Sequence, residues 1–298
     1  MKICTIKNSS LVITGILIFI LPVKVFGQAD SLSQSMKSLT TDSIMPGPIH
    51  SLYVTSGACS NMIYLGSSIS QNKPLYSTGV SYGYRSSLFV SASVSHLNGV
   101  DPFVAFSTLS LNYSHTFNSW FDISSDISGF KTSKSLQDTL FSDFTFFNFT
   151  TGFDWKLMYT KVSLGGLISR DKRGYLQIRN SRYFETPELF KGKGLISFDP
   201  NINILFGEVV KIETTTGIKK YGASPPFRHL KKNPNNTSET YTYKFGLMDF
   251  EFSLPVTFTY GRFSVEAVPD YILPAFTNTE YPAPKGFSVF LYLFIRIF

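Results

Sequence analysis

The chain has 298 residues, of which 16% are charged and 16% are aromatic, and its formal net charge is +7. A soluble domain carries roughly 25% charged residues, and a disordered chain has far fewer apolar ones, so the composition argues against both classes. With only two cysteines, a disulfide scaffold and a four-cysteine zinc site are excluded.

Residues 1–27 predict a cleaved signal peptide. Lys2 and Lys7 precede an apolar run over 11–23, and compact residues stand just before the expected cleavage at Gln28. The run is shorter than the roughly 17 to 25 residues that a membrane-spanning helix needs. Cleavage removes lysines and no acidic residue, so the mature chain is only mildly basic. That charge gives no support for nucleic-acid binding.

The mature chain is expected to begin with a flexible periplasmic segment over 28–59, because its first part is rich in Ser and Thr without a period. Whether 50–56 adds a short strand stays open. Over 60–298 apolar and polar residues alternate, which is typical of β-strands with one apolar face. In 75–85, for example, one face carries Tyr76, Thr78, Val80, Tyr82 and Tyr84, and the other carries Ser77, Gly79, Ser81 and Gly83.

Two architectures use such strands. A β-sandwich buries the apolar face under a second sheet, whereas a transmembrane barrel turns that face toward lipid. Here the apolar face is rich in aromatic residues, with 29 Phe and 16 Tyr in the chain, and the opposite face is mostly Ser, Thr, Gly, Asn and Asp. In hydrocarbon an open sheet edge would leave backbone groups without hydrogen bonds. We therefore predict an all-β, closed antiparallel transmembrane barrel over 60–298, located in the outer membrane.

The alternation predicts about twelve strands, within a range of roughly 10–14, since 175–178 offers a further hairpin within the stretch 170–193. Arg85–Ser86 and Gly207 are expected to be short connections, whereas 131–140, 170–193, 219–240 and 274–285 are long and polar. Bacterial barrels have short periplasmic turns and longer external loops, so the long connections are expected to lie outside. The expected strands are 60–70, 75–85, 87–96, 103–116, 119–130, 141–155, 161–169, 194–206, 208–218, 241–259, 262–273 and 286–298.

The last expected strand, 286–298, ends in Phe298. It resembles the C-terminal strand of Gram-negative outer-membrane β-barrel proteins, and that resemblance implies that Phe298 is a signal read by the barrel-insertion machinery. The segments 252–265 and 269–274 look like a hairpin of poorly characterised barrels from Bacteroidota. Arg296 departs from the pattern, since members of the family usually carry an aromatic or aliphatic residue at that position.

Charged residues at the inward positions are the candidate lining of the lumen. One interpretation is that ion pairs and hydrogen bonds fill and stiffen the interior. The other is a path that favours cations, because carboxylates lower the energy of a passing cation. The candidate lumen residues are Asp122, Asp126, Asp199, Glu213, Asp249, Glu251, Glu266, Asp270, Lys211 and Arg262.

Catalysis receives little support from the sequence. A hydrolase needs a nucleophile, a base and an orienting group within hydrogen-bond reach of one another. The candidate bases are the four histidines, His50, His96, His115 and His229. His96 and His115 are expected at opposite ends of the barrel. The sequence contains no Gly-rich phosphate loop, HExxH or CxxC motif. We therefore expect no enzyme activity, no catalytic residues, and no cofactor or metal site.

These observations favour a passive pore or small-solute transporter with an acidic lumen. The alternative is a non-conducting barrel that serves as a structural or assembly partner in an envelope complex, and an outer-membrane hydrolase ranks last. The expected partners are outer-membrane lipid, a small solute, and lipopolysaccharide, which the basic stretch 219–240 could contact. A lumen that is plugged would favour the non-conducting alternative.

Overall fold

The structure is a computed structural model that describes residues 49–137, 141–168, 173–214, 219–223, 239–276 and 284–298. The predicted signal peptide, the first part of the expected flexible segment, and most of the basic stretch 219–240 lie outside the described residues. Within the described part of the chain, no helix is long and apolar enough to cross a membrane.

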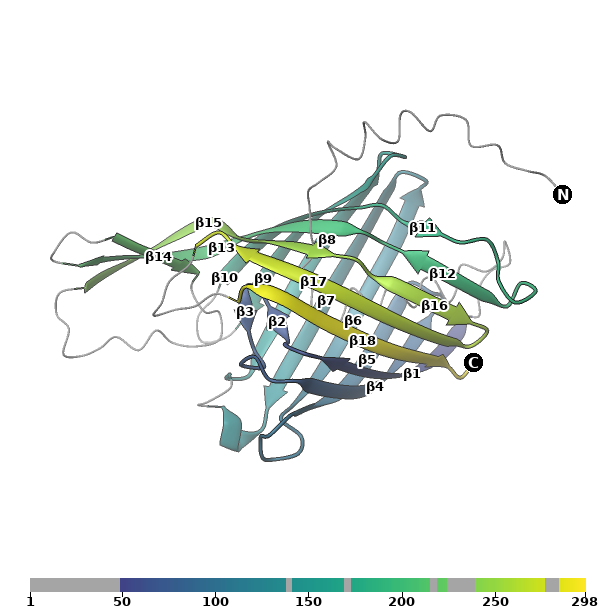
Figure 1. The fold of residues 1–298 in the computed structure, drawn as a ribbon, viewed down its shortest axis with the longest axis horizontal. Helices are drawn as coiled ribbons and strands as arrows, with labels where there is room; N and C mark the ends of the chain where they lie inside the picture. The colour runs from purple at the N-terminus through teal and green to yellow at the C-terminus, as the bar shows by residue number, and fades with distance from the viewer. Residues whose placement is uncertain (1–48, 138–140, 169–172, 215–218, 224–238, 277–283) are drawn as a thin grey trace.

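Twelve antiparallel strands close into a barrel, as the sequence predicts (Figure 1). Each strand pairs with the next along the chain, and the last pairs with the first, with Tyr53 opposite Arg296. The strands of the wall are β1 (His50–Cys59), β4 (Leu75–Tyr84), β5 (Leu88–Leu97), β6 (Phe106–Asn118), β7 (Phe121–Thr132), β8 (Phe144–Asp154), β9 (Tyr159–Ile168), β10 (Arg173–Ser181), β13 (Asn201–Thr214), β15 (Glu239–Ser253), β17 (Phe263–Pro274) and β18 (Gly286–Arg296).

The period-two pattern divides the residues between the two faces of the wall. On β4, Tyr76, Val80 and Tyr82 are exposed on the outer face, whereas Ser81 and Gly83 are buried on the inner face. Successive side chains of a strand point to opposite faces, so the alternation in the sequence becomes an apolar exterior and a polar interior.

The number of strands is confirmed, but four assignments within it are wrong. The barrel begins at His50, so β1 belongs to the wall and not to the flexible segment. The stretch 60–70 is not a wall strand, and β10 lies within the stretch 170–193 that is expected to be a loop, over the residues 175–178 that offer a hairpin. The expected strands 194–206 and 208–218 form one run broken before residue 201, because Gly207 lies inside β13 rather than in a turn.

Three neighbouring strands of the wall are interrupted at the same level along the barrel. β10 continues as β11 (Phe184–Glu185), β13 is preceded by β12 (Gly194–Phe198), and β15 is followed by β16 (Val256–Tyr260). Proline has no N–H to donate to a neighbouring strand, and Pro200 and Pro255 stand at two of the breaks. The Asp199 N–H still donates to the Pro255 carbonyl oxygen at 3.1 Å, so the sheet continues across the gap.

The connections differ in length between the two ends of the barrel. At the short-turn end, residues 85–87 join β4 to β5, and residues 261–262 join β16 to β17. β1 begins and β18 ends at this same end of the barrel. Part of the expected external loop, 182–193, also lies at this end, because β10 and β9 pair with Ser181 opposite Tyr159. At the opposite, long-loop end β13 and β15 extend beyond the wall together with β14 (Lys219–Ala223), as Figure 1 shows.

Candidate functional site in the lumen

A short hairpin occupies the lumen between β1 and β4. The plug hairpin, residues 60–74, contains β2 (Ile63–Tyr64) and β3 (Ser67–Ser68), which pair only with each other. Leu65 and Gly66 form its two-residue turn with φ values of 49° and 72°, as a type I′ turn requires. The Met62 N–H donates to Ser70 Oγ at 2.8 Å, so the hairpin is braced by its own polar side chains.

The plug hairpin completes an apolar layer across the lumen. The Tyr64 ring lies 5.4 Å from the Phe130 ring, 6.0 Å from Phe144 and 5.7 Å from Phe146, measured between centroids. All twelve strands, or the residues just beyond them, add side chains to this layer. From the wall these are Cys59, Leu75, Leu97, Ala105, Phe106, Phe130, Leu136, Phe141, Phe144, Phe146, Leu167, Tyr175, Leu205, Val209, Met248, Phe276 and Phe290.

The tip of the plug hairpin reaches a β-bulge on the wall between β13 and β15. A methyl group added to Gly66 would stand 3.0 Å from both Asp249 Oδ2 and Met248 Cε, and 3.6 Å from Leu205 Cδ2. The pairing of β13 with β15 shifts register between Leu205 and Phe206. A bulge re-aims side chains, and here two consecutive residues, Met248 and Asp249, are both buried. The bulge therefore presents an apolar and an acidic group to the hairpin tip.

Six of the candidate lumen residues lie on the inner face of the wall. Asp122 accepts a hydrogen bond from the Tyr159 hydroxyl at 2.6 Å, and Asp126 accepts one from Ser128 Oγ at 2.9 Å. These two lie on β7. The other four, on β15 and β17, are Asp249, Glu251, Glu266 and Asp270.

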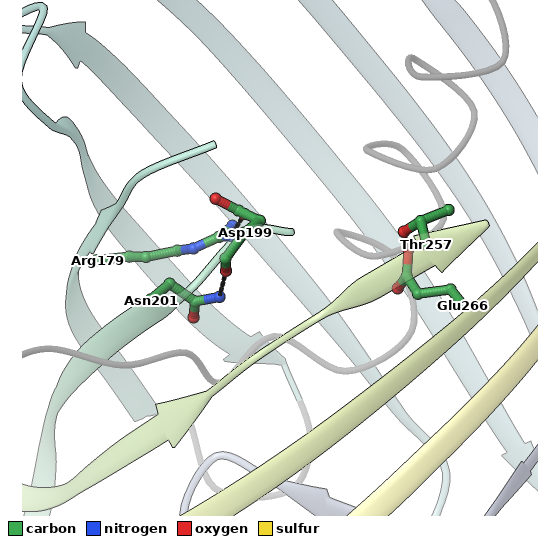
Figure 2. Close-up of polar contacts among 5 residues, drawn as sticks. All are labelled: Arg179, Asp199, Asn201, Thr257 and Glu266. Atoms are coloured by element: carbon green, nitrogen blue, oxygen red, sulfur yellow. Dashed lines mark hydrogen bonds and ion pairs between the residues drawn. The ribbon is translucent and has the colours of Figure 1, made fainter. Parts of the chain in front are cut away.

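An ion pair spans one of the strand breaks. Arg179 Nη2 lies 2.5 Å from Asp199 Oδ2, and the two side chains are only 5% and 13% exposed. Asn201 Nδ2 donates to the Asp199 carbonyl oxygen at 2.6 Å. Figure 2 shows this group together with the pair in which Thr257 Oγ1 donates to Glu266 Oε2 at 3.1 Å. Asp199 is thus tied to the wall rather than directed into an open channel.

The remaining candidates lie away from the lumen wall. Lys211 Nζ and Glu213 Oε1 are 2.5 Å apart on the part of β13 that pairs with β14, beyond the wall. Arg262 lies in the turn after β16, where its Nη1 donates to the Ile297 carbonyl oxygen at 3.0 Å. Phe298 is exposed beside the closing pair of strands, and its carbonyl oxygen accepts from the Leu52 N–H at 3.2 Å.

The plug hairpin and Asn203 are not identified by the alternation of the sequence. The hairpin contains an unbroken apolar run that is buried, Met62, Ile63, Tyr64 and Leu65, and the expected wall strand 60–70 includes this run. Four apolar residues in succession do not alternate, which is the signal that distinguishes them from the strands of a barrel wall. Asn203 lies on the inner face of β13 and is 0% exposed. The sequence does not distinguish it from the other polar residues that alternate along the strand.

No catalytic arrangement emerges among the described residues. His50 Nδ1 lies 2.5 Å from the Tyr82 hydroxyl, and His96 Nδ1 lies 2.7 Å from the Phe103 carbonyl oxygen. Within the described ranges no group of three or more His, Cys, Asp or Glu residues could hold a metal ion.

Comparisons with known proteins identify distant structural neighbours only. No family model and no curated protein matches the chain. The NanC porin is 8% identical over 82% of this chain and 98% of the porin, with a TM-score of 0.43. A bacterial polysaccharide outer membrane secretin is 8% identical over 84% of this chain and 99% of its own, with a TM-score of 0.40. OccAB3 of Acinetobacter baumannii is 11% identical over 84% of this chain and 65% of its own, with a TM-score of 0.36. These TM-scores are too low to carry an argument about function.

Proposed function

We propose that the protein is an outer-membrane β-barrel in which the plug hairpin closes the lumen, and that it conducts a small cationic solute when the hairpin leaves. One observation carries the proposal. A complete apolar layer lies at the long-loop end, and the wall beside it is polar and acidic.

The outer surface supports a membrane location. Soluble monomers rarely expose contiguous apolar patches larger than a few hundred Å², and a closed sheet leaves no strand edge to the lipid. Near the short turns the outer face carries Tyr84, Trp120, Trp155 and Tyr260, all exposed, which is where an aromatic girdle is expected. The exposed residues elsewhere on the outer face include Tyr76, Val80, Val90, Val94, Leu109, Leu111, Ile127, Phe147, Phe149, Leu164, Phe287 and Leu291.

The apolar layer supports a closed state. Hydrophobic constrictions in channels stop conduction by excluding water. The layer is formed by side chains from all around the wall, with Tyr64 of the plug hairpin against the rings of β7 and β8. An ion crossing it would lose its hydration without gaining a polar partner.

The way in which the plug hairpin is joined to the wall supports the proposal that it can leave the lumen. Cys59 on β1 lies directly opposite Leu75 on β4, so the wall is complete without the residues between them. The hairpin strands form a sheet of their own, and its release therefore breaks no pairing between strands of the wall.

The acidic wall supports a preference for cations. Asp249, Glu251, Glu266 and Asp270 lie on the inner faces of β15 and β17, and neither 246–253 nor 263–274 contains a Lys or Arg. A wall of carboxylates lowers the energy of a cation in the lumen and raises that of an anion.

A non-conducting barrel is the second candidate. It is favoured by the same apolar layer, because a plug whose buried side chains belong to one apolar cluster with those of the wall is costly to remove. In that case the protein is a structural or assembly partner in an envelope complex, which it contacts through its surface, and it transports no solute.

Planar-bilayer recordings of the refolded chain distinguish the two functions. We expect the wild type to be mostly closed, and a variant in which Asn-Gly replaces residues 60–74 to conduct steadily with a cation preference, since two-residue Asn-Gly turns join paired strands. Adding Asp249→Asn and Glu251→Gln should weaken that preference. Heat-modifiable migration in gels shows that each variant is folded. A folded deletion variant without conductance would support the non-conducting barrel.

A further inference from the structure

A group of basic and aromatic side chains lies on the outer face beside the turn between β4 and β5. This arginine patch consists of His50, Tyr82, Tyr84 and Arg85, and all four side chains are exposed. The guanidinium carbon of Arg85 lies 5.3 Å from the centroid of the Tyr84 ring. His50 lies opposite Tyr84 with 5.5 Å between the ring centroids, and its Nδ1 is 2.5 Å from the Tyr82 hydroxyl. Contacts with tyrosines of the outer face therefore hold both basic groups on that face.

The backbone of the turn is unfavourable for an arginine. Arg85 and Ser86 have φ values of 51° and 54°, and turns with two such residues favour Asn, Asp and Gly. The Arg85 N–H donates to the Ile49 carbonyl oxygen at 2.8 Å, which fixes the turn to the beginning of β1. Residues held in a left-handed conformation cost free energy and are common at binding sites. The conformation thus supports a role for the Arg85 side chain.

This part of the wall contains no carboxylate that could compensate Arg85. The strands β1, β4, β5 and β6 include no Asp or Glu, and the one acidic residue within 49–118 is Asp101, in the connection at the long-loop end. Among the described residues, the Arg85 guanidinium contacts the Tyr84 ring and forms no ion pair. An exposed contact between a cation and a ring contributes little, so the guanidinium is available to an external anion.

The arginine patch lies at the level expected for lipid phosphates. Tyr84 belongs to the aromatic girdle, and girdle residues lie among the headgroups of a bilayer. Farther from the turn on the same face, Val54 and Val80 lie opposite each other and are both exposed. A lipid whose acyl chain contacts these valines places its headgroup at the arginine patch. This step rests on the proposed membrane location and does not depend on conduction.

The side chains of the patch restrict the headgroup. A guanidinium binds two oxygens of one phosphate through its planar fork, and tyrosine and histidine side chains form hydrogen bonds with hydroxyl groups. An ammonium group of a headgroup pairs best with a carboxylate, and the four strands around the patch contain none. The patch therefore favours a headgroup with hydroxyl groups over one with an amine.

From this arrangement we infer that the arginine patch binds an anionic phospholipid whose headgroup carries hydroxyl groups and no amine. The Arg85 guanidinium binds the phosphate, and the pair of His50 and Tyr82 contacts the headgroup hydroxyls. Val54 and Val80 contact an acyl chain of the same lipid.

Phosphatidylglycerol and phosphatidylethanolamine with identical acyl chains are suitable probes, because they differ only in the headgroup. Native mass spectrometry of the refolded chain in detergent measures how much of each lipid stays bound as its concentration rises. We expect phosphatidylglycerol to bind in a saturable manner and about fivefold more tightly than phosphatidylethanolamine, the usual contribution of one basic residue to the binding of an anionic lipid.

Variants locate the binding. Arg85→Gln removes the charge and should reduce the preference for phosphatidylglycerol to less than about twofold. His50→Phe retains a ring beside Tyr84 without its nitrogens, and should weaken phosphatidylglycerol binding about threefold. Lys156→Gln is the matched control, because Lys156 is an exposed basic residue in the turn between β8 and β9 at the same end of the barrel. It should bind as the wild type does, and heat-modifiable migration shows that each variant is folded.

Four outcomes would overturn the site. Equal affinity for the two lipids would contradict the headgroup, and an unchanged preference in folded Arg85→Gln would contradict the role of the guanidinium. An equal loss in Lys156→Gln would show attraction by all the basic turns together. Displacement of phosphatidylglycerol by an equal concentration of glycerol phosphate would show a site for free phosphate rather than for a lipid. Because binding is measured in detergent, none of these outcomes decides whether the barrel conducts, which the bilayer recordings test separately.

Discussion

Gly207 of β13 provides the space that Met248 of β15 occupies. A methyl group at position 207 would stand 2.5 Å from Met248 Sδ and 2.7 Å from Tyr175 Cδ1. Met248 is the residue that the bulge turns toward the plug tip, so the absence of a side chain at Gly207 is a condition for closing the lumen.

Gly207→Ala should therefore destabilise the barrel by about 1–3 kcal/mol, the usual cost of overpacking. The midpoint of urea unfolding in detergent measures it. Gly129→Ala is the matched control, because a methyl group on that strand glycine meets only the Leu109 carbonyl oxygen, at 3.9 Å. It should change stability by no more than about 0.5 kcal/mol. Equal losses in the two variants would contradict the packing described for Met248.

Tyr64→Ala should loosen the plug hairpin. The variant removes the ring that contacts Phe130, Phe144 and Phe146, and deleting a buried aromatic side chain costs about 3 kcal/mol. Channel openings in bilayers should become up to about a hundredfold more frequent. Tyr113→Ala removes the same side chain from the outer face of β6 and should leave the openings unchanged. A Tyr64→Ala barrel as silent as the wild type would count against a movable plug.

Arg179→Met should disturb the break between β12 and β13. The variant leaves the Asp199 carboxylate poorly exposed without its ion-pair partner, and breaking a buried pair costs about 3–5 kcal/mol. Hydrogen exchange should rise across 182–199 more than in the rest of the wall. Arg182→Met, which removes an exposed contact to the Lys156 carbonyl oxygen, is the control with a small expected effect. Exchange that rises equally in both variants would show that the Arg179 ion pair does not hold the break.

Leu164→Arg tests the membrane location. Leu164 is 59% exposed near the middle of β9, and Ile168 is 56% exposed on the same face at the strand end. In a bilayer an arginine costs about 2–4 kcal/mol at the midplane and at most about 1 kcal/mol near the interface. Folding into lipid vesicles should therefore suffer much more from Leu164→Arg than from Ile168→Arg. Nearly equal effects would mean that the outer face does not contact hydrocarbon.

The wall of the barrel was largely predictable from sequence, and the contents of the lumen were not. Strands such as β4 alternate without interruption, because lipid on one side and polar interior on the other impose a period of two. The plug hairpin does not have a period of two, because it does not separate lipid from the interior. Tyr64 is buried by Phe130 and Phe146, which follow it by more than sixty positions in the sequence, and local periodicity contains no information on contacts of that range.

The errors in strand assignment have a similar origin. Gly207 suggests a turn in the sequence because glycine commonly marks one, although its role is to leave space for Met248 from the neighbouring strand. β10 does not stand out in the sequence because its inward positions include Arg173 and Arg179, whose ion-pair partners, Glu208 and Asp199, come from the neighbouring part of the chain.

The contact between β1 and β18 sets a constraint on how the barrel assembles. Every other pair in the wall joins strands that follow one another in the chain, whereas this pair joins the two ends of the barrel sequence. Directly after β1, Ser60 Oγ accepts a hydrogen bond from the Val289 N–H of β18 across 229 positions. Pairings between distant segments form slowly, and until this one forms both strands have open edges that can pair with other chains. The period before closure is therefore when the nascent protein is most vulnerable to aggregation, and substitutions in β1 or β18 should reduce the yield of folded protein more than equal substitutions in β5 or β6.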